Sequence, residues 1–267
     1  MLEIRNAVFG GIVRIMAGAA MLLLIAPTLI VLLMSFTGDY TLRFPPRSWS
    51  ARWYWELIDN SPQIIATALV SLQVAVVATI VAASLGTLAA VSIAGRRERW
   101  ALALDAAFMS PMVFPAMSLG LALLLLLSVG GIPLSTWTLA AGHVVVVTPF
   151  VIRMVSAAAQ QMDPALLDCA DSLGASRVYR FFTITLPLIK PGVIAGSVVA
   201  FLASIDHVPV SLMLSDPRTE TLPIHLWALL ESNLDVRVAS VSGVMVGVTM
   251  LVVVLLDRRM FTQRRRA

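Results

Sequence analysis

Six long apolar runs constrain this chain more than any other feature of its sequence. They lie at 15–36, 64–94, 101–129, 132–152, 193–214 and 238–256. A helix needs about 20 apolar residues to cross a hydrocarbon core roughly 30 Å thick, which each run supplies. A soluble core could not absorb a composition that is 59% hydrophobic and 13% charged. We therefore expect an all-α polytopic membrane protein with six transmembrane helices, forming a single transmembrane domain over 1–267.

Two details of these runs need explanation. The second and third runs exceed the minimum length, which predicts tilt or extension beyond the bilayer rather than additional spans. The first run follows Arg5 and Arg14, as the apolar part of a secretory signal would. It is about 20 residues long, however, and no small-x-small cleavage motif follows before Gly38. We expect it to be a retained first span.

The basic residues are distributed unevenly between the two sides that six spans would create. Fourteen fall on the side of the termini, namely Arg5, Arg14, Arg96, Arg97, Arg99, Arg153, Arg177, Arg180, Lys190, Arg258, Arg259, Arg264, Arg265 and Arg266. Five fall on the other side, namely Arg43, Arg47, Arg52, Arg218 and Arg237. The asymmetry predicts that both termini and the loop around 153–190 are cytoplasmic. The pI near 10.0 then reflects topology and contact with anionic membrane lipid, not nucleic-acid binding.

The longest polar interruption, 163–191, predicts two short helices. Asp163 is a good N-cap and Pro164 suits a first helical turn, while Gly174 can adopt the left-handed conformation that ends a helix. Ser176 can cap a second helix, after which Pro187 and Pro191 are expected to turn the chain back into the membrane.

The first of these helices has an apolar stripe with nothing of its own to cover it. The stripe contains Leu166, Leu167, Ala170 and Leu173, and the opposite side carries Asp168, Asp171 and Ser172. Such a helix can lie on lipid headgroups or insert into a groove on another protein.

The same segment carries a spaced motif. Its residues are Asp168, Cys169, Ala170, then Gly174, Ile184, Leu186 and Pro187. This spacing resembles the EAA loop of ATP-binding-cassette importer permeases, and the resemblance extends over most of the chain. It implies a type I importer fold whose coupling helix contacts an ATPase through Asp168, Ala170, Leu173 and Gly174, with Leu186 and Pro187 completing the motif. Aspartate replaces the usual glutamate at 168, and Cys169 replaces the first alanine. Cys169 is the single cysteine, so no disulfide within the chain is expected.

The resemblance also implies a set of partners. They are a second homologous permease subunit, two cytoplasmic ABC ATPase subunits and a periplasmic substrate-binding protein, assembled at the bacterial inner membrane. We expect no cofactor in this chain, because its only lysine, Lys190, stands between Ile189 and Pro191 and cannot belong to a P-loop. ATP and Mg²⁺ are expected on the partner ATPase.

Polar groups at membrane depth are the candidates for a solute path, because they are costly unless they face a cavity or a partner. Asp206 lies about 13 residues into the fifth run, roughly 20 Å from its cytoplasmic end. In the polyamine-type branch of the family a Ser-x-Asp-Asp pattern occupies this place. Ser204 and Asp206 match it, whereas His207 replaces the second acid, and Met112 stands where an acid is common. Asp206 can alternatively be a cap or gate element at the outer end of the span.

Other residues carry weaker predictions. The segment 221–231 is too short to span and predicts an outer half-helix, which makes Trp227 a further candidate for the path. His143 is expected to be a hydrogen-bonded packing residue, and the three histidines have no metal-ligand spacing. Trp49, Trp53 and Trp55 predict an aromatic interface belt, with contact to a binding protein as the alternative. Gly192 with Gly196, and Gly243 with Gly247, would let helices approach closely.

The sequence therefore predicts a permease subunit of an ATP-driven importer that moves a polyamine or related amine into the cytoplasm, and no enzymatic activity in this chain. The alternative solutes are an amino-acid derivative, an opine or a phosphonate. A secondary transporter driven by an ion gradient is the alternative mechanism, although we find one good intramembrane acid and no convincing repeat. An integral-membrane enzyme would need a nucleophile-base-acid set or H-E-x-x-H, and the sequence contains neither.

Overall fold

The structure is a computed structural model that describes residues 2–264. Helices are the regular elements of this range, and β pairing is limited to isolated bridges of Thr37 with Trp49 and of Thr41 with Asp235. The all-helical class is confirmed. Contacts divide the chain into two compact units, Met1–Ile65 with Leu226–Ala267 and Ala66–His225, and each is described by itself.

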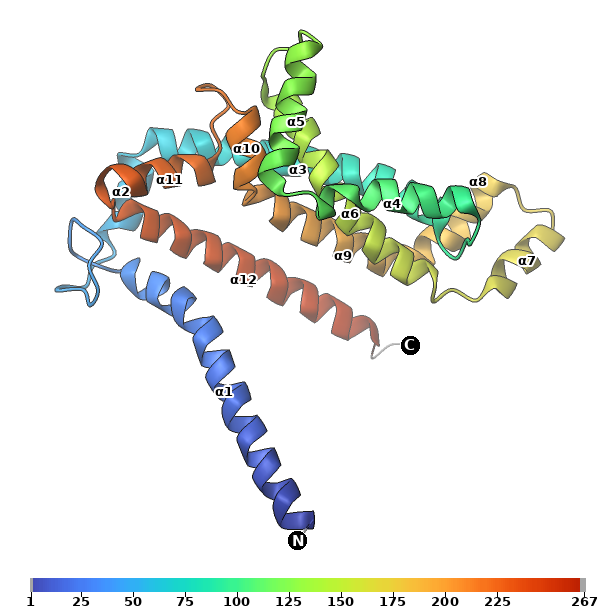
Figure 1. Ribbon diagram of the computed structural model, residues 1–267, viewed down its shortest axis with the longest axis horizontal. Helices are drawn as coiled ribbons and strands as arrows, with labels where there is room; N and C mark the ends of the chain where they lie inside the picture. The colour runs from blue at the N-terminus through green and yellow to red at the C-terminus, as the bar shows by residue number, and fades with distance from the viewer. Residues whose placement is uncertain (1, 265–267) are drawn as a thin grey trace. The chain divides into compact units, whose positions relative to one another are not determined.

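The unit Ala66–His225 contains most of the helices. Its elements are most of α3 (Pro62–Ile93), α4 (Arg99–Val113), α5 (Ala116–Val129), α6 (Thr136–Ala159), α7 (Pro164–Ser172), α8 (Arg177–Arg180), the π turn η1 (Phe181–Thr185), α9 (Leu186–Ile205) and α10 (Val208–Leu214). The helix α6 packs along α9, with α4 and α10 also against α6. Figure 1 shows α7 and α8 beyond the ends of α6 and α9.

Close contact between α6 and α9 depends on two glycines. A Cβ at Gly192 would lie 2.7 Å from Ala158 Cβ, and a Cβ at Gly196 would lie 3.0 Å from Val151 Cα. The expectation for this small-residue pair is confirmed. The fully buried side chains of Val151, Ile152 and Val155 on α6 and of Ile189 on α9 form the core at this contact, joined by alanines of α3.

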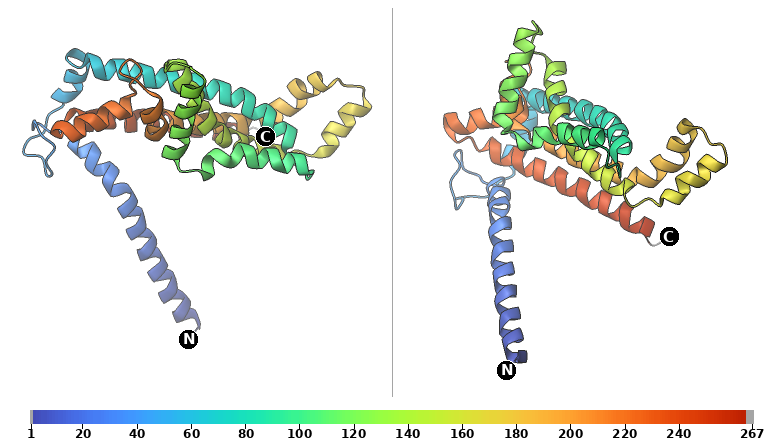
Figure 2. Two further views of the ribbon diagram at one scale, coloured as in Figure 1. Left: turned by 45° about the horizontal axis from the view of Figure 1, so that its top comes forward. Right: turned by 45° about the vertical axis from the view of Figure 1, so that its right-hand side comes forward.

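The third apolar run is not one straight helix. The axes of α4 and α5 differ by 107° across a break at Phe114 and Pro115. Phe114 has an extended backbone with ψ 144°, the conformation that a following proline favours. The run at 101–129 is therefore not one straight helix, while its crossing of the membrane as a single bent span stays a prediction. Figure 2 shows α5 turned away from α4.

The fifth apolar run also has different limits. The helical path continues from Arg177 through the π turn to Ile205, so Pro187 and Pro191 lie inside the helical path and do not turn the chain. Pro187 is tolerated because it occupies the first turn of α9, directly after the π turn, whereas Pro191 lies inside α9. After Ile205 the helix breaks, and α10 begins at Val208. The helical path thus begins and ends earlier than the predicted span 193–214, and the limits of that span in a membrane stay a prediction.

The other unit contains α1 (Leu2–Met34), α2 (Arg52–Asp59), most of α11 (Leu222–Asn233) and α12 (Arg237–Arg264). Both α1 and α2 pack against α12. Tyr54 Oη donates to Ser35 Oγ at 2.7 Å, and Ser240 Oγ donates to the Ser35 carbonyl at 3.3 Å, so these hydroxyls join the three helices. Gly243 packs closely against Tyr54 and Ser35, whereas Gly247 meets nothing within 4 Å. The second small-residue pair is thus confirmed at Gly243 alone.

Four helices are long and apolar enough to cross a membrane within the described residues. They are Phe9–Met34, Pro62–Ile93, Thr136–Ala159 and Arg177–Ile205. The bent pair α4 and α5 could supply a fifth span, and the apolar part of α12, Arg237–Leu251, is shorter. A membrane-spanning helical protein is confirmed, while the count of six spans stays a prediction.

Candidate functional site

The corner between α7 and α8 is held by local hydrogen bonds. Asp163 Oδ1 accepts from Ala165 N–H at 2.9 Å and caps the start of α7. At its end, Gly174 has φ +75° and donates to the Asp171 carbonyl at 3.0 Å, while Ala175 N–H donates to the Ala170 carbonyl at 3.0 Å. These two bonds form a Schellman motif. The predicted caps at Asp163 and Gly174 are confirmed.

The start of α8, on the other side of the corner, is also capped by a side chain. Ser176 Oγ accepts from Tyr179 N–H at 3.2 Å, which caps α8 as the sequence predicted. Leu186 and Pro187, the last residues of the spaced motif, begin α9 rather than sitting on the corner. The motif therefore extends from the corner into the first turn of α9, along one continuous helical path from Arg177 to Ile205.

The outer surface of α7 is the part of this corner that is free for a partner. Asp168 and Cys169 are exposed, Leu173 is 88% exposed and Ala170 is buried. A shallow depression of about 430 Å³ lies on this surface, lined by Ala165, Asp168, Cys169, Ser172 and Leu173. The structure thus brings the predicted coupling residues of α7 together on one surface, apart from Ala170.

Sequence reasoning missed an ion pair that closes the corner. The Arg180 guanidinium on α8 binds the Asp171 carboxylate on α7. The pair spans the turn at Gly174 and adds a side-chain link to its backbone hydrogen bonds. Opposite charges nine residues apart, on either side of a glycine turn, were the available signal.

The second cluster lies where α6 meets the break between α9 and α10. His143 on α6 is buried, with Nδ1 2.8 Å from Ser204 Oγ and Nε2 2.9 Å from Ser211 Oγ. Ser204 belongs to the last turn of α9 and Ser211 to the first turns of α10. The prediction of a hydrogen-bonded packing histidine is confirmed. Ser211 was not predicted, because its partner lies 68 residues away in the sequence.

Asp206 and His207 occupy the break itself. Asp206 is the C-cap of α9 and is exposed, which matches the alternative of an acid at the helix end rather than one within a continuous helix. His207 is the N-cap of α10, with Nδ1 accepting from Val210 N–H at 3.4 Å. Its ring meets that of His143 edge-on, with centroids 5.7 Å apart. The structure thus brings Ser204, Asp206 and His207 together at one helix break, and their contact with solute stays a prediction.

Two tryptophan predictions concern the other unit. Trp227 lies on α11, which confirms a short helix at 221–231, and is 59% exposed. Its place on a solute path remains untested. Trp49 and Trp55 are exposed as an interface belt requires, but Trp53 is 9% exposed and its indole N–H donates to the Asp39 carbonyl at 3.1 Å. Trp53 therefore holds the loop before α2 in place, and the belt prediction was wrong for this residue.

Two curated permeases are similar to this chain over most of its length. The spermidine/putrescine transport system permease protein PotC of Haemophilus influenzae is 31% identical over 230 residues, covering 86% of this chain and 88% of that protein. The putrescine transport system permease protein PotI of Escherichia coli is 32% identical over 235 residues, covering 84% of this chain and 82% of that protein.

A crystal structure of a bacterial ABC transporter involved in the import of the acidic polysaccharide alginate has the same fold. Its TM-score is 0.68 at 13% sequence identity, with 96% of each chain covered. The sequence profile described as "Binding-protein-dependent transport system inner membrane component" matches residues 82–266, which include the α7 to α8 corner and the cluster around His143. This chain belongs to the family of binding-protein-dependent transport system inner membrane components.

Proposed function

We propose that this chain is the permease subunit of an ATP-driven importer that carries a polyamine or a related amine from periplasm to cytoplasm. The observation that carries this proposal is the exposed carboxylate of Asp206 at the break between α9 and α10. A carboxylate at membrane depth is costly unless it faces a cavity, and there it attracts cations. The two permease relatives, named for spermidine and putrescine, favour the same class of solute.

Energy enters through the α7 to α8 corner in this proposal. The exposed surface around Asp168 and Leu173 would dock on a separate cytoplasmic ATPase subunit, and α9 would carry the resulting movement to Asp206. ATP and Mg²⁺ belong to that subunit. A second permease subunit would complete the path, and a periplasmic binding protein would deliver the solute. With the bent pair α4 and α5 as one span and α12 as the last of six, both termini lie on the same cytoplasmic side as this corner.

Uptake by the assembled system tests the solute class. Vesicles containing this subunit with its partner permease, ATPase and binding protein should accumulate labelled putrescine or spermidine when ATP is supplied inside. Asp206→Asn should raise KM for the dication about tenfold, since loss of one ionic contact to a charged group removes roughly 1.5 kcal/mol. The matched control is Asp105→Asn, a carboxylate on α4, which should leave KM unchanged. Equal KM values for Asp206→Asn and the original protein would remove Asp206 from the path.

Competition in the same vesicles addresses the alternative solutes. An excess of an unlabelled opine, amino-acid derivative or aminophosphonate should leave amine uptake unchanged. If one of these compounds strongly inhibited uptake of the labelled amine while other unlabelled amines inhibited it little, that compound class would replace the amine as the proposed solute. Depleting ATP while holding the proton gradient should stop uptake, and persistent uptake would favour an ion-driven transporter.

A further inference from the structure

The break between α9 and α10 is weakly held by its own backbone. His207 N–H reaches the Ser204 carbonyl at 3.3 Å, and the cap bond from Val210 N–H to His207 Nδ1 is 3.4 Å long. Both lengths exceed the usual range of about 2.7–3.2 Å for N–H donors, so both bonds are weak. The angle at which Asp206 is presented is therefore not determined by local hydrogen bonds alone.

One side chain from another helix links both sides of the break. His143 on α6 bonds Ser204, two residues before Asp206, and Ser211, four residues after His207. All three side chains are at least 98% buried, since their exposed fractions are 2%, 2% and 1%. A neutral imidazole has one donor and one acceptor, and a hydroxyl can serve as either, so the two serines satisfy both ring nitrogens.

The backbone of α6 also approaches α10 closely beside this histidine. A Cβ at Gly142 would lie 2.4 Å from Leu214 Cδ1 and 3.2 Å from Val210 Cγ1. The His143 ring in turn meets the His207 ring edge-on. Packing and two hydrogen bonds therefore hold the end of α9 and the start of α10 against the same part of α6.

We propose that His143 is a positioning residue, which through Ser204 and Ser211 fixes the break between α9 and α10 so that Asp206 is presented to the solute. This inference rests on the proposed role of Asp206 in the path. It assigns to His143 and Ser211 an effect on solute affinity, although neither touches solute. Coupling to ATP hydrolysis takes place at the α7 to α8 corner and does not depend on this link.

Kinetics of the assembled transporter provide the first test. His143→Leu removes both hydrogen bonds and should raise KM for the labelled amine about tenfold, the size expected from losing hydrogen bonds to a buried group, with Vmax within about twofold. His143→Gln can reach the position of Nε2 and His143→Asn that of Nδ1, so each should restore part of the affinity. Ser211→Ala should act in the same direction as His143→Leu.

The matched control is Thr148→Val on the same helix. Thr148 Oγ1 donates to the Val144 carbonyl of α6 itself at 2.6 Å, so the hydrogen bond lost in this variant lies within α6. KM should stay unchanged in this variant. A lower Vmax or less membrane-inserted subunit for His143→Leu, at unchanged KM, would show a merely structural histidine and overturn the proposal.

Thiol labelling provides a readout that does not depend on transport. In a Cys169→Ser background, His207→Cys places one thiol at the break, and its reaction rate with a water-soluble maleimide is measured in vesicles. Adding His143→Leu should change this rate at least about threefold, while adding Thr148→Val should not. An unchanged rate would overturn the proposal. If His143→Leu alters labelling and Asp206→Asn leaves KM unchanged, the path assignment fails and the link between the helices stands.

Discussion

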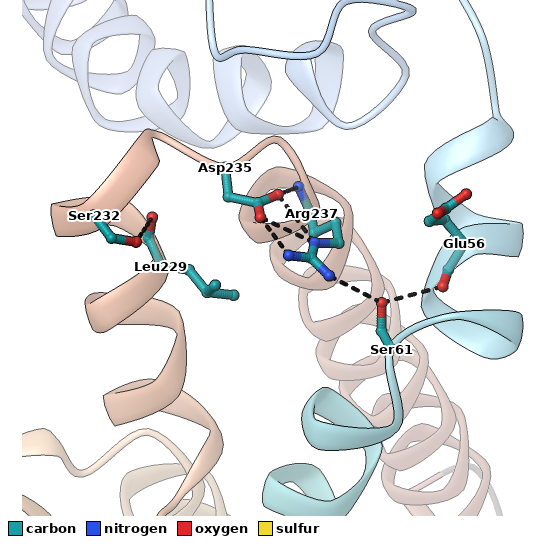
Figure 3. Close-up of polar contacts among 6 residues, drawn as sticks. All are labelled: Glu56, Ser61, Leu229, Ser232, Asp235 and Arg237. Carbon is teal, nitrogen blue, oxygen red and sulfur yellow. Dashed lines mark hydrogen bonds and ion pairs between the residues drawn. The ribbon is translucent and has the colours of Figure 1, made fainter.

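Arg237 binds the carboxylate of Asp235, two residues before it, with Nε and Nη2 at 3.0 and 2.6 Å from Oδ2. The same carboxylate accepts from the Arg237 backbone N–H at 2.9 Å and so caps the start of α12. Arg237 also reaches Ser61 Oγ at 3.5 Å, and Ser61 Oγ donates to the Glu56 carbonyl at 3.1 Å (Figure 3). This chain of contacts ties the start of α12 to the end of α2 on the predicted outer side.

Asp235→Ala should lower the stability of the subunit. The loss of a helix-capping carboxylate costs about 1 kcal/mol, which corresponds to a fall in melting temperature of about 3 °C for a chain of this size. The measurement is thermal unfolding of the purified subunit in detergent at pH 7. Asp59→Asn, an exposed acid at the end of α2, serves as the control. An unchanged melting temperature for Asp235→Ala would refute the capping role.

The stabilisation by Asp235 should depend on pH in a defined direction. Burial alone would raise the pKa of this carboxyl, but the side-chain and backbone hydrogen bonds from Arg237 outweigh it, and its pKa lies below the usual value. The stabilisation is therefore fully present above the unfolded pKa, near pH 4, and is lost as the pH falls through the lower folded pKa. The difference in melting temperature between the original protein and Asp235→Ala should shrink as the pH is lowered below about 4. A difference that widens there would contradict this sign.

Local chemistry explains what could be predicted from the sequence. The caps at Asp163, Gly174 and Ser176 each depend on residues within a few positions, so residue type and spacing were sufficient. The apolar runs predicted the helical class for a different reason. Within a bilayer the backbone must form its hydrogen bonds inside the protein, and a helix satisfies them within one segment.

The angles and exact positions of the helix breaks could not be predicted, because an apolar run indicates the length of a span but not a change of direction within it. Pro115, after Phe114, and Pro209, in the first turn of α10, fall within the predicted runs 101–129 and 193–214. A capping residue followed by a proline at the first turn, as in His207 with Pro209, was the missed signal. The hydrogen-bond partners of His143 lie 61 and 68 residues away in the sequence, so they could not be predicted without knowing how α6 packs against α9 and α10.

Gly174→Val should abolish coupling. A Cβ at this position would meet nothing within 4 Å, so the cost is backbone strain at φ +75° and not a clash. A β-branched residue in this conformation costs roughly 1–2 kcal/mol or more, whereas asparagine tolerates it. Uptake and transport-linked stimulation of ATP hydrolysis should fall together in Gly174→Val, with the amount of subunit in the membrane unchanged, and Gly174→Asn should retain most activity. Normal uptake by Gly174→Val would contradict the coupling role.

Charge reversal tests the ion pair of Asp171 on α7 with Arg180 on α8. Asp171→Arg or Arg180→Asp alone should reduce the transport-linked ATPase activity, because each leaves two like charges facing one another across the corner. The double variant should recover most of it, since the pair is restored in the opposite order. The carboxylate is 55% exposed, so the pair contributes at most about 1 kcal/mol and the single-variant defects should shrink at high salt. A double variant as impaired as either single variant would show that the residues act independently.

Gly192 lies in a close contact between two helices, whereas Gly247 lies in an open part of its helix, so alanine at the two positions can be compared directly. A Cβ at Gly192 would lie 2.7 Å from both Ala158 Cβ and the Met154 carbonyl oxygen, so α9 must move away from α6 in Gly192→Ala. Overpacking of this kind costs about 1–3 kcal/mol. Gly247 also lies within a helix but meets nothing within 4 Å, so Gly247→Ala makes the same chemical change without a clash. Thermal unfolding in detergent should show a lower melting temperature for Gly192→Ala and an equal or higher one for Gly247→Ala, since alanine favours a helix interior by about 0.5–1 kcal/mol. If both variants melted at the same temperature, the close approach of α6 and α9 at Gly192 would not contribute to the stability of the subunit. The helical path from the α7 to α8 corner to Asp206 would then not be stabilised by packing against α6 at this position.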